Sequence, residues 1–299
     1  MFEITRIAQL LGHTAAIYAL APFRQPSQFL SAAGDGWIVA WDLEHLPDGK
    51  LIAKVEDNIF ALHYMAENDT VIVGTMNGYV IWINLADNSI LHKSLAHSKG
   101  VFAIYQVGLQ IYTAGADGKL IWWDSKKYIK KESLQLAYQS LRNIKHDDNI
   151  LYIGSTDGNI YTVDLKTFTS TMPIINAHES SVFALYIDKE AYLWTGGKDA
   201  HLKIWQLADK KLLSSQPAHL FTVNSICELE HLNIIATASR DKTVKLWDKS
   251  TKKLLEVLDT MRHQMHMRSI NALWYNVHYQ VLVTASDDRS LMLWQINKS

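Results

Sequence analysis

The sequence predicts an all-β fold in which seven four-stranded sheets form a closed ring, a single seven-bladed β-propeller. Three observations predict it. One stretch recurs seven times, strand-forming residues dominate every copy, and a spare strand precedes the first copy while the last copy lacks one. The 299 residues then form one domain, with 48% apolar and 20% charged residues, as is usual for a globular protein.

Each repeat has an apolar run, a turn around an acidic or amide residue, and a second run that in most copies ends in Trp-Asp or Trp-Gln. The copies are "SAAGDGWIVAWD" (31–42), "VGTMNGYVIWIN" (73–84), "TAGADGKLIWWD" (113–124), "IGSTDGNIYTVD" (153–164), "TGGKDAHLKIWQ" (195–206), "TASRDKTVKLWD" (237–248) and "TASDDRSLMLWQ" (284–295). The turn residues are Asp35, Asn77, Asp117, Asp157, Asp199, Asp241 and Asp288, spaced by 42, 40, 40, 42, 42 and 47 residues. This period is typical of a repeat fold.

Four short strands are expected in each copy. The first begins with a recurring word such as "IYAL" (17–20) or "VFAL" (182–185), and the next two flank the turn. The third strands are expected to end near residues 42, 84, 124, 164, 206, 248 and 295. A fourth follows, as in "KLLSSQ" (211–216). The first two strands read as almost continuous apolar runs, which indicates sheets covered on both faces, as in propeller blades.

The repeats resemble those of the WD40-repeat β-propeller family along the whole chain. Two motifs carry the resemblance, a His just before the first strand and a Trp-Asp pair closing the third. They are Gly12-His13, Ala96-His97, Ala177-His178 and Ala218-His219, and Trp41-Asp42, Trp123-Asp124 and Trp247-Asp248. The resemblance implies that the spare strand at 3–10 completes the last blade, which leaves no open sheet edge between the ends.

Five repeats contain a His, a hydroxyl, an Asp and a Trp at fixed positions. The sets are His13, Ser31, Asp35 and Trp41; His97, Thr113, Asp117 and Trp123; His178, Thr195, Asp199 and Trp205; His219, Thr237, Asp241 and Trp247; and His266, Thr284, Asp288 and Trp294. An indole N–H only donates, a carboxylate only accepts, and hydroxyl and imidazole do both, so each set can form a hydrogen-bonded chain from Trp to Asp. We expect these chains to be structural.

The second and fourth repeats lack the set as a unit. They carry Val55, Val73, Asn77 and Ile83, and Ala137, Ile153, Asp157 and Val163, at the four positions. A half-satisfied buried network is worse than none, which explains the joint replacement. The same residue types form hydrolase triads, but a nucleophile is exposed and unique, whereas this set recurs five times beside a sealing Trp. No catalytic residue is predicted.

The second residue of each first strand is the candidate partner-binding position. The seven residues are Tyr18, Phe60, Phe102, Arg142, Phe183, Asn224 and Asn271. The resemblance implies that they surround the wide mouth of the central channel. Two interpretations stay open: a recognition pocket, whose rings could hold a partner's Lys or Arg, or core packing between blades, which is slightly favoured.

Two further segments, 259–269 and 126–132, carry candidate binding residues. The long connection at 259–269 carries Arg262 and His263 and is expected at the same mouth, as a contact loop or simply a solvated one. His263 and His266 suggest a metal, but His266 belongs to a hydrogen-bonded chain and no further ligands stand nearby, so no metal and no cofactor are predicted. The basic cluster "KKYIKKE" (126–132) has two interpretations: residues 126–131 bind nucleic acid weakly, or they form a soluble outer edge of the sheet.

These observations favour a non-enzymatic protein-interaction scaffold that binds a protein or peptide partner at the mouth, monomeric alone and part of a larger complex. The alternatives are an enzyme with a non-repeating site and weak nucleic-acid binding.

A formal net charge of −1 gives no overall basic field, no run of 18 apolar residues predicts a membrane span, and no signal peptide is evident. The single Cys227 excludes an internal disulfide and fits a reducing compartment, so we expect the cytoplasm, or the nucleus in a eukaryote.

Overall fold

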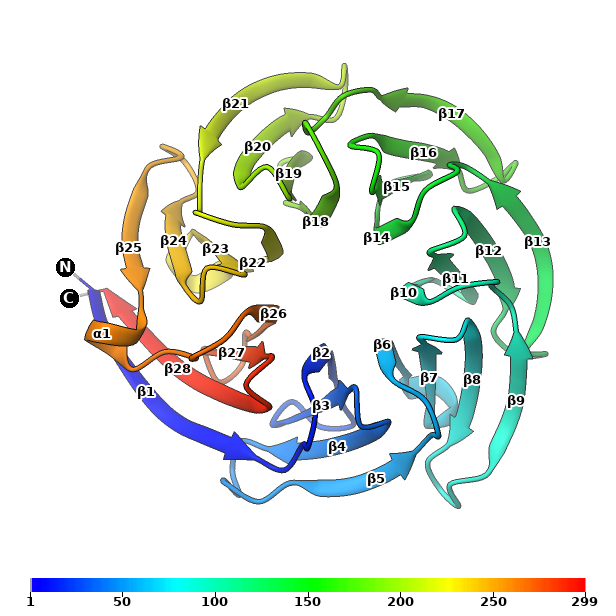
Figure 1. Ribbon diagram of the computed structural model, residues 1–299, viewed down its shortest axis with the longest axis horizontal. Helices are drawn as coiled ribbons and strands as arrows, with labels where there is room; N and C mark the ends of the chain where they lie inside the picture. Colours follow the sequence, from blue (N-terminus) through cyan, green and yellow to red (C-terminus); the bar gives the residue numbers. More distant parts are fainter. Residues whose placement is uncertain (1, 299) are drawn as a thin grey trace.

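The computed structural model describes residues 2–298 and shows seven four-stranded antiparallel sheets around a central opening (Figure 1). The predicted all-β, seven-bladed propeller is confirmed. We number the blades one to seven by their inner strands, which lie next to the opening in the order β2, β6, β10, β14, β18, β22 and β26.

Each blade runs outward through an inner, a second, a third and an outer strand. Blades one to four contain β2 (Ile17–Pro22), β3 (Gln28–Ala33), β4 (Trp37–Asp42) and β5 (Lys50–Lys54); β6 (Ile59–Met65), β7 (Thr70–Thr75), β8 (Tyr79–Asn84) and β9 (Ile90–Leu95); β10 (Val101–Val107), β11 (Gln110–Gly115), β12 (Lys119–Asp124) and β13 (Ile129–Gln135); and β14 (Leu141–Asp147), β15 (Ile150–Ser155), β16 (Ile160–Asp164) and β17 (Thr169–Ile174).

Blades five to seven follow the same plan. They contain β18 (Val182–Ile187), β19 (Tyr192–Gly197), β20 (His201–Gln206) and β21 (Lys211–Pro217); β22 (Val223–Leu229), β23 (Ile234–Ser239), β24 (Val244–Asp248) and β25 (Leu254–Leu258); and β26 (Ile270–Asn276), β27 (Val281–Ser286), β28 (Ser290–Lys298) and β1 (Phe2–Leu11). Short helices follow β6, β22 and β25, at η1 (Ala66–Asn68), η2 (Glu230–Leu232) and α1 (Thr260–His263).

The ring is closed by pairing between the two ends of the chain. β1 lies antiparallel to β28, from the pair Phe2 and Lys298 to the pair Leu11 and Ser290. The predicted closure by the N-terminal strand is confirmed, and the termini lie side by side (Figure 1). β28 runs past residue 295 to Lys298 because β1 continues to pair with it. Residues 1 and 299 of the expected domain lie outside the described residues.

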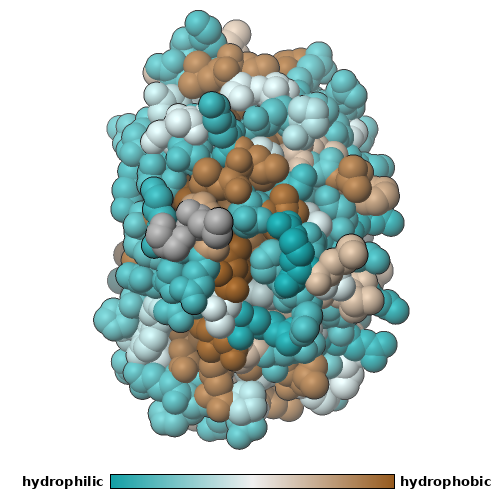
Figure 2. All heavy atoms as spheres, turned by 90° about the vertical axis from the view of Figure 1, so that its left-hand side faces the viewer, coloured by the Kyte–Doolittle hydropathy of each residue, from teal (hydrophilic) through white to brown (hydrophobic). Residues whose placement is uncertain are grey.

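The hydrophobic core lies between neighbouring blades. Between blades one and two, for example, Leu30 and Ile38 pack with Val71 and Val73, and all six residues of β7 are buried. Both faces of a sheet are covered in this arrangement, which is why its central strands are almost continuously apolar. The outer strands face solvent, and Figure 2 shows apolar side chains among polar ones on the rim beside the termini.

The two faces of the ring differ in their connections. We call top the face where each outer strand connects to the next inner strand, and bottom the opposite face. The turns between second and third strands also lie on top, and their tightness requires a left-handed residue after the turn Asp. Gly36 takes φ +75°, and a Cβ there would stand 2.1 Å from the carbonyl oxygen of Val55. Lys242 occupies the same conformation in blade six at φ 72° without a glycine.

Candidate functional site

The His, hydroxyl, Asp and Trp residues of each polar repeat lie together inside their blade. In blade five, Trp205 Nε1 donates to Thr195 Oγ1 at 3.1 Å, and His178 Nε2 lies 2.8 Å from the same oxygen. His178 Nδ1 lies 2.8 Å from Asp199 Oδ1. We call such a set a relay. The other four relays have the same geometry: His13, Ser31, Asp35 and Trp41; His97, Thr113, Asp117 and Trp123; His219, Thr237, Asp241 and Trp247; and His266, Thr284, Asp288 and Trp294.

Each relay holds a connection of the top face against a turn. The Asp199 carboxylate also accepts from the backbone N–H groups of Glu179 and His201, at 3.1 and 3.2 Å. Burial alone would raise the pKa of Asp199, but the hydrogen bond and charge of His178 and these N–H groups lower it to about 2. An ionised Asp and a neutral, Nδ1-protonated imidazole satisfy every contact. The relay therefore fixes the loop from which the inner strand starts.

Blades two and four have no relay. Val73 and Ile83 are buried in blade two. The loop and the turn are still joined there, but the carboxylate comes from the loop: Asp57 accepts from the backbone N–H of the turn residue Asn77 at 3.0 Å. In blade four the turn carboxylate of Asp157 accepts from the Tyr161 hydroxyl at 2.8 Å. These blades are apolar at the positions of the relay His, hydroxyl and Trp and keep a polar residue only at the turn.

The seven candidate binding residues all lie at the same structural feature, a β-bulge at the top of the inner strand. Pairing between inner and second strands shifts register there in every blade, for example between Ile17 and Ala19 and between Leu141 and Asn143. The residue skipped by the register is the candidate itself. A bulge turns one side chain out of the normal alternation. The seven side chains that it redirects are Tyr18, Phe60, Phe102, Arg142, Phe183, Asn224 and Asn271.

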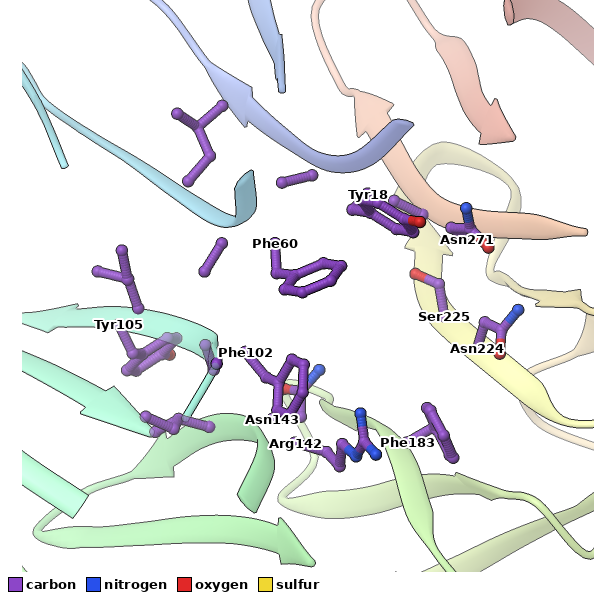
Figure 3. Close-up of a pocket in the computed structure, with 18 of the residues that line it drawn as sticks. Tyr18, Phe60, Phe102, Tyr105, Arg142, Asn143, Phe183, Asn224, Ser225 and Asn271 are labelled. Carbon is purple, nitrogen blue, oxygen red and sulfur yellow. The ribbon is translucent and has the colours of Figure 1, made fainter. Parts of the chain in front are cut away.

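These seven side chains line one open cavity of about 940 Å³ at the centre of the ring (Figure 3). Each of them is half-buried. They face the cavity and are not part of the fully buried core, although several also pack against side chains of neighbouring blades. The sequence offered no sign of the bulges, because a bulge is a property of strand pairing and not of one strand's residue pattern.

Five of the seven residues form a continuous row of contacts. The ring centroids of Tyr18 and Phe60 are 4.8 Å apart, and those of Phe60 and Phe102 are 5.5 Å apart. Arg142 Cζ then lies 4.3 Å from the ring centroid of Phe102 and 4.9 Å from that of Phe183. The guanidinium thus fills the space between two rings, as a cation–π contact favours.

The two amides belong to the opposite side of the mouth and tie blades together. Asn224 Nδ2 donates to the carbonyl oxygen of Ile270 at 2.9 Å, and Asn271 Nδ2 donates to that of Ile17 at 3.0 Å. Their donors are thus used within the protein. The side chains available to a partner are therefore those of the row formed by Tyr18, Phe60, Phe102, Arg142 and Phe183.

The expectation that Arg262 and His263 lie at the central mouth is wrong. They belong to α1, which packs against β1 at the outer rim (Figure 1), and neither lines the central cavity. The Arg262 guanidinium is occupied by Asp259 and Glu256, at 3.0 and 3.1 Å. Met265 is buried beneath this segment. Local ion pairs and a short helix draw the long connection outward, away from the axis.

The basic segment 126–131 lies at the turn between β12 and β13 and along outer strand β13, far from the top mouth. Lys131 pairs with Asp124, with 3.4 Å between Nζ and Oδ2. The segment is thus an outer edge of blade three. No helix in residues 2–298 is long and apolar enough to cross a membrane.

Comparison with known proteins shows repeats and a fold similar to those of WD40 propellers. A family model described as "WD domain, G-beta repeat" matches residues 4–42, 210–248 and 257–295. The WD40 β-propeller domain of Doa1 superposes with a TM-score of 0.87 at 16% identity, over 99% of this chain and 97% of that one. The protein is a closed all-β propeller. Three of its repeats match the WD40 family model, and the whole chain has the fold of a WD40 propeller.

Two curated relatives show the extent of the likeness. Transducin beta-like protein 3 of Rattus norvegicus is 23% identical over 270 residues, covering 81% of this chain and 33% of that protein. The WD repeat-containing protein srw1 of Schizosaccharomyces pombe is 22% identical over 252 residues, covering 82% of this chain and 45% of that protein. The chain thus spans less than half the length of either relative. WD40 propellers generally act as protein-interaction scaffolds.

Proposed function

We propose that this propeller is a non-enzymatic scaffold that binds a segment of a protein partner in the cavity at the mouth of its top face. The observation that carries the proposal is the convergence of seven bulged side chains, one from each blade, on one open cavity of about 940 Å³. An open cavity with aromatic walls and a few oriented polar groups suits a peptide segment.

The distribution of exposed apolar side chains also favours the top face. Among the large apolar residues of 2–298, the connections and turns of the top face expose Met76, Tyr138, Ile175, Leu220, Phe221, Met261 and Met267, whereas those of the bottom face expose Leu109 and Val277. Exposed apolar groups around a cavity are typical of interaction surfaces. A partner docked on the mouth would cover several of them.

The relays do not favour the enzyme alternative. Thr195 is fully buried and His178 nearly so, with Trp205 packed across the hydroxyl. A hydroxyl without access to substrate cannot act as a nucleophile. We therefore assign a structural role to the relays, which hold in place the loops from which the inner strands start.

The test is affinity capture from the native cell with wild-type protein and with the triple variant Phe60→Ala, Phe102→Ala, Phe183→Ala. We expect the variant to lose its main partners, because truncating central aromatic anchors costs about 2 kcal/mol or more each. The matched control replaces Leu91, Leu213 and Leu254, exposed on outer strands, with Ala and should keep them. Capture of the same partners by the aromatic variant, with its thermal unfolding still cooperative, would reject the mouth as the site.

A further inference from the structure

Arg142 is oriented by three groups, while the outer end of its guanidinium stays free. Its plane lies between the Phe102 and Phe183 rings, and Nε donates to Thr156 Oγ1 at 3.1 Å. Among residues 2–298, neither Nη atom has a hydrogen-bond partner and no carboxylate lies within ion-pair distance. An oriented guanidinium with two free donors matches a bidentate carboxylate.

Among the described residues, those that line the cavity include three cations and no carboxylate. Its charged lining residues are Lys99, Arg142 and Lys145, in a protein whose formal net charge is −1. The Asp287 carboxylate near the mouth is not part of the lining and accepts from Asn271 Nδ2 at 2.7 Å. The formal charge of the lining residues is therefore positive, which favours an anionic occupant.

Lys145 is a second cation of the inner strand β14 and also lines the cavity. Its Nζ lies 5.5 Å from the Tyr105 ring centroid and forms no ion pair within the described part of the chain. Burial lowers the pKa of this ammonium, because little water reaches it. Arg142 and Lys145, two cations of one strand, thus line the cavity without a counter-ion among residues 2–298.

We propose that the mouth recognises an acidic partner segment, with an Asp or Glu carboxylate on the Nη atoms of Arg142 and a neighbouring apolar side chain on Phe60 and Phe102. This rests on the proposed function and names the chemistry of the partner. It replaces the expectation that the rings hold a partner's Lys or Arg, because Arg142 already occupies the space between two of the rings.

The experiment selects random unphosphorylated linear peptides displayed on phage against immobilised wild-type protein, Arg142→Met and Arg240→Met. Arg240 is an exposed arginine in a top-face turn outside the cavity, so its variant is the matched control. We expect wild type and Arg240→Met to select peptides with Asp or Glu beside a large apolar residue, and Arg142→Met to lose the acidic preference. Peptides without that preference, peptides rich in Lys or Arg, or no selected peptide at all would overturn the proposal.

Affinity of the most enriched acidic peptide then sharpens the assignment. Arg142→Met should weaken it at least about tenfold, the exposed Lys99→Met about two- to fivefold, and added salt should weaken binding to the wild type. The Lys99 and salt measurements do not depend on the folding of the Arg142 variant. Binding only when the acidic residue is replaced by phosphoserine would contradict the carboxylate assignment.

The cell-capture experiment separates this inference from the proposed function. If partners captured by the wild type are lost in the aromatic triple variant but retained by Arg142→Met, the scaffold function stands and the acidic preference is wrong. If both variants retain all partners, the mouth is not the docking site and both proposals fall.

Discussion

Blades five and two solve the same packing problem in opposite ways. In blade five, Thr195 satisfies Trp205 and His178 inside the sheet, and Asp199 completes the relay. In blade two, Val73 stands where Thr195 does, Ile83 replaces the Trp, and both are buried. The difference teaches that the buried His, hydroxyl and Trp are kept or replaced together, because the loss of the hydroxyl would leave the buried indole and imidazole nitrogens without their partner.

The largest effect is expected when one central member is removed from a relay. Thr195→Val keeps the shape of the side chain but leaves the Trp205 N–H and His178 Nε2 buried without a partner. We expect a loss of about 2–5 kcal/mol in the free energy of unfolding. Urea unfolding measures it, and Ile153→Val at the same position of blade four should cost only about 0.5–1.5 kcal/mol.

A double-mutant cycle sharpens this comparison. Trp205→Phe removes the indole donor, so Thr195→Val should cost less in that background than in the wild type. Strictly additive costs would show that the two side chains do not act as a unit, and the contrast with blade two would lose its explanation.

The relays also predict an acid-sensitive stability. Burial lowers the pKa of His13, His178 and His219 below the ordinary 6.5, although the partner carboxylates act in the opposite direction. The unfolded chain binds protons near pH 6.5 that the folded chain does not, so stability present above that pH is lost as the pH falls. We expect the free energy of unfolding to decrease from about pH 7 to about pH 5.5.

Urea unfolding at several pH values tests this, with His178→Leu and the exposed His278→Leu as a matched pair. The first should flatten the pH dependence and the second should leave it unchanged. Burial also lowers the pKa of His63 and His231, so part of the slope should remain in His178→Leu. Asp199 contributes only at lower pH, below its ordinary 3.8. A wild-type stability that stays constant or rises on acidification would contradict the prediction.

Much of this architecture was predictable because it is encoded by local, repeated patterns. In five repeats the turn Asp, the hydroxyl four residues before it and the Trp six after it mark the second and third strands, as at Thr195, Asp199 and Trp205. Repetition in register gives each element seven chances to be recognised. The closing strand followed from a missing fourth strand in the last repeat and a spare one before the first.

The mouth was less predictable because its geometry depends on contacts between blades. Arg142 takes its position from Phe102, Phe183 and Thr156, which belong to three different segments. The outward course of α1 depends on ion pairs of Arg262 with Glu256 and Asp259. No single repeat records these interactions, so the sequence located the position of each candidate residue but not what it touches.

The smallest effect is expected where the turn residue belongs to no relay. Asn77 is exposed in the turn of blade two, and Val55 lies buried at the position of the relay His. Asn77→Asp should therefore change the free energy of unfolding by no more than about 0.5 kcal/mol, slightly unfavourably because Asp57 already caps that turn. Its counterpart Asp199→Asn weakens three accepted hydrogen bonds and should cost about 1–3 kcal/mol. Equal costs for the two substitutions would mean that the turn, and not the relay, is what the carboxylate stabilises.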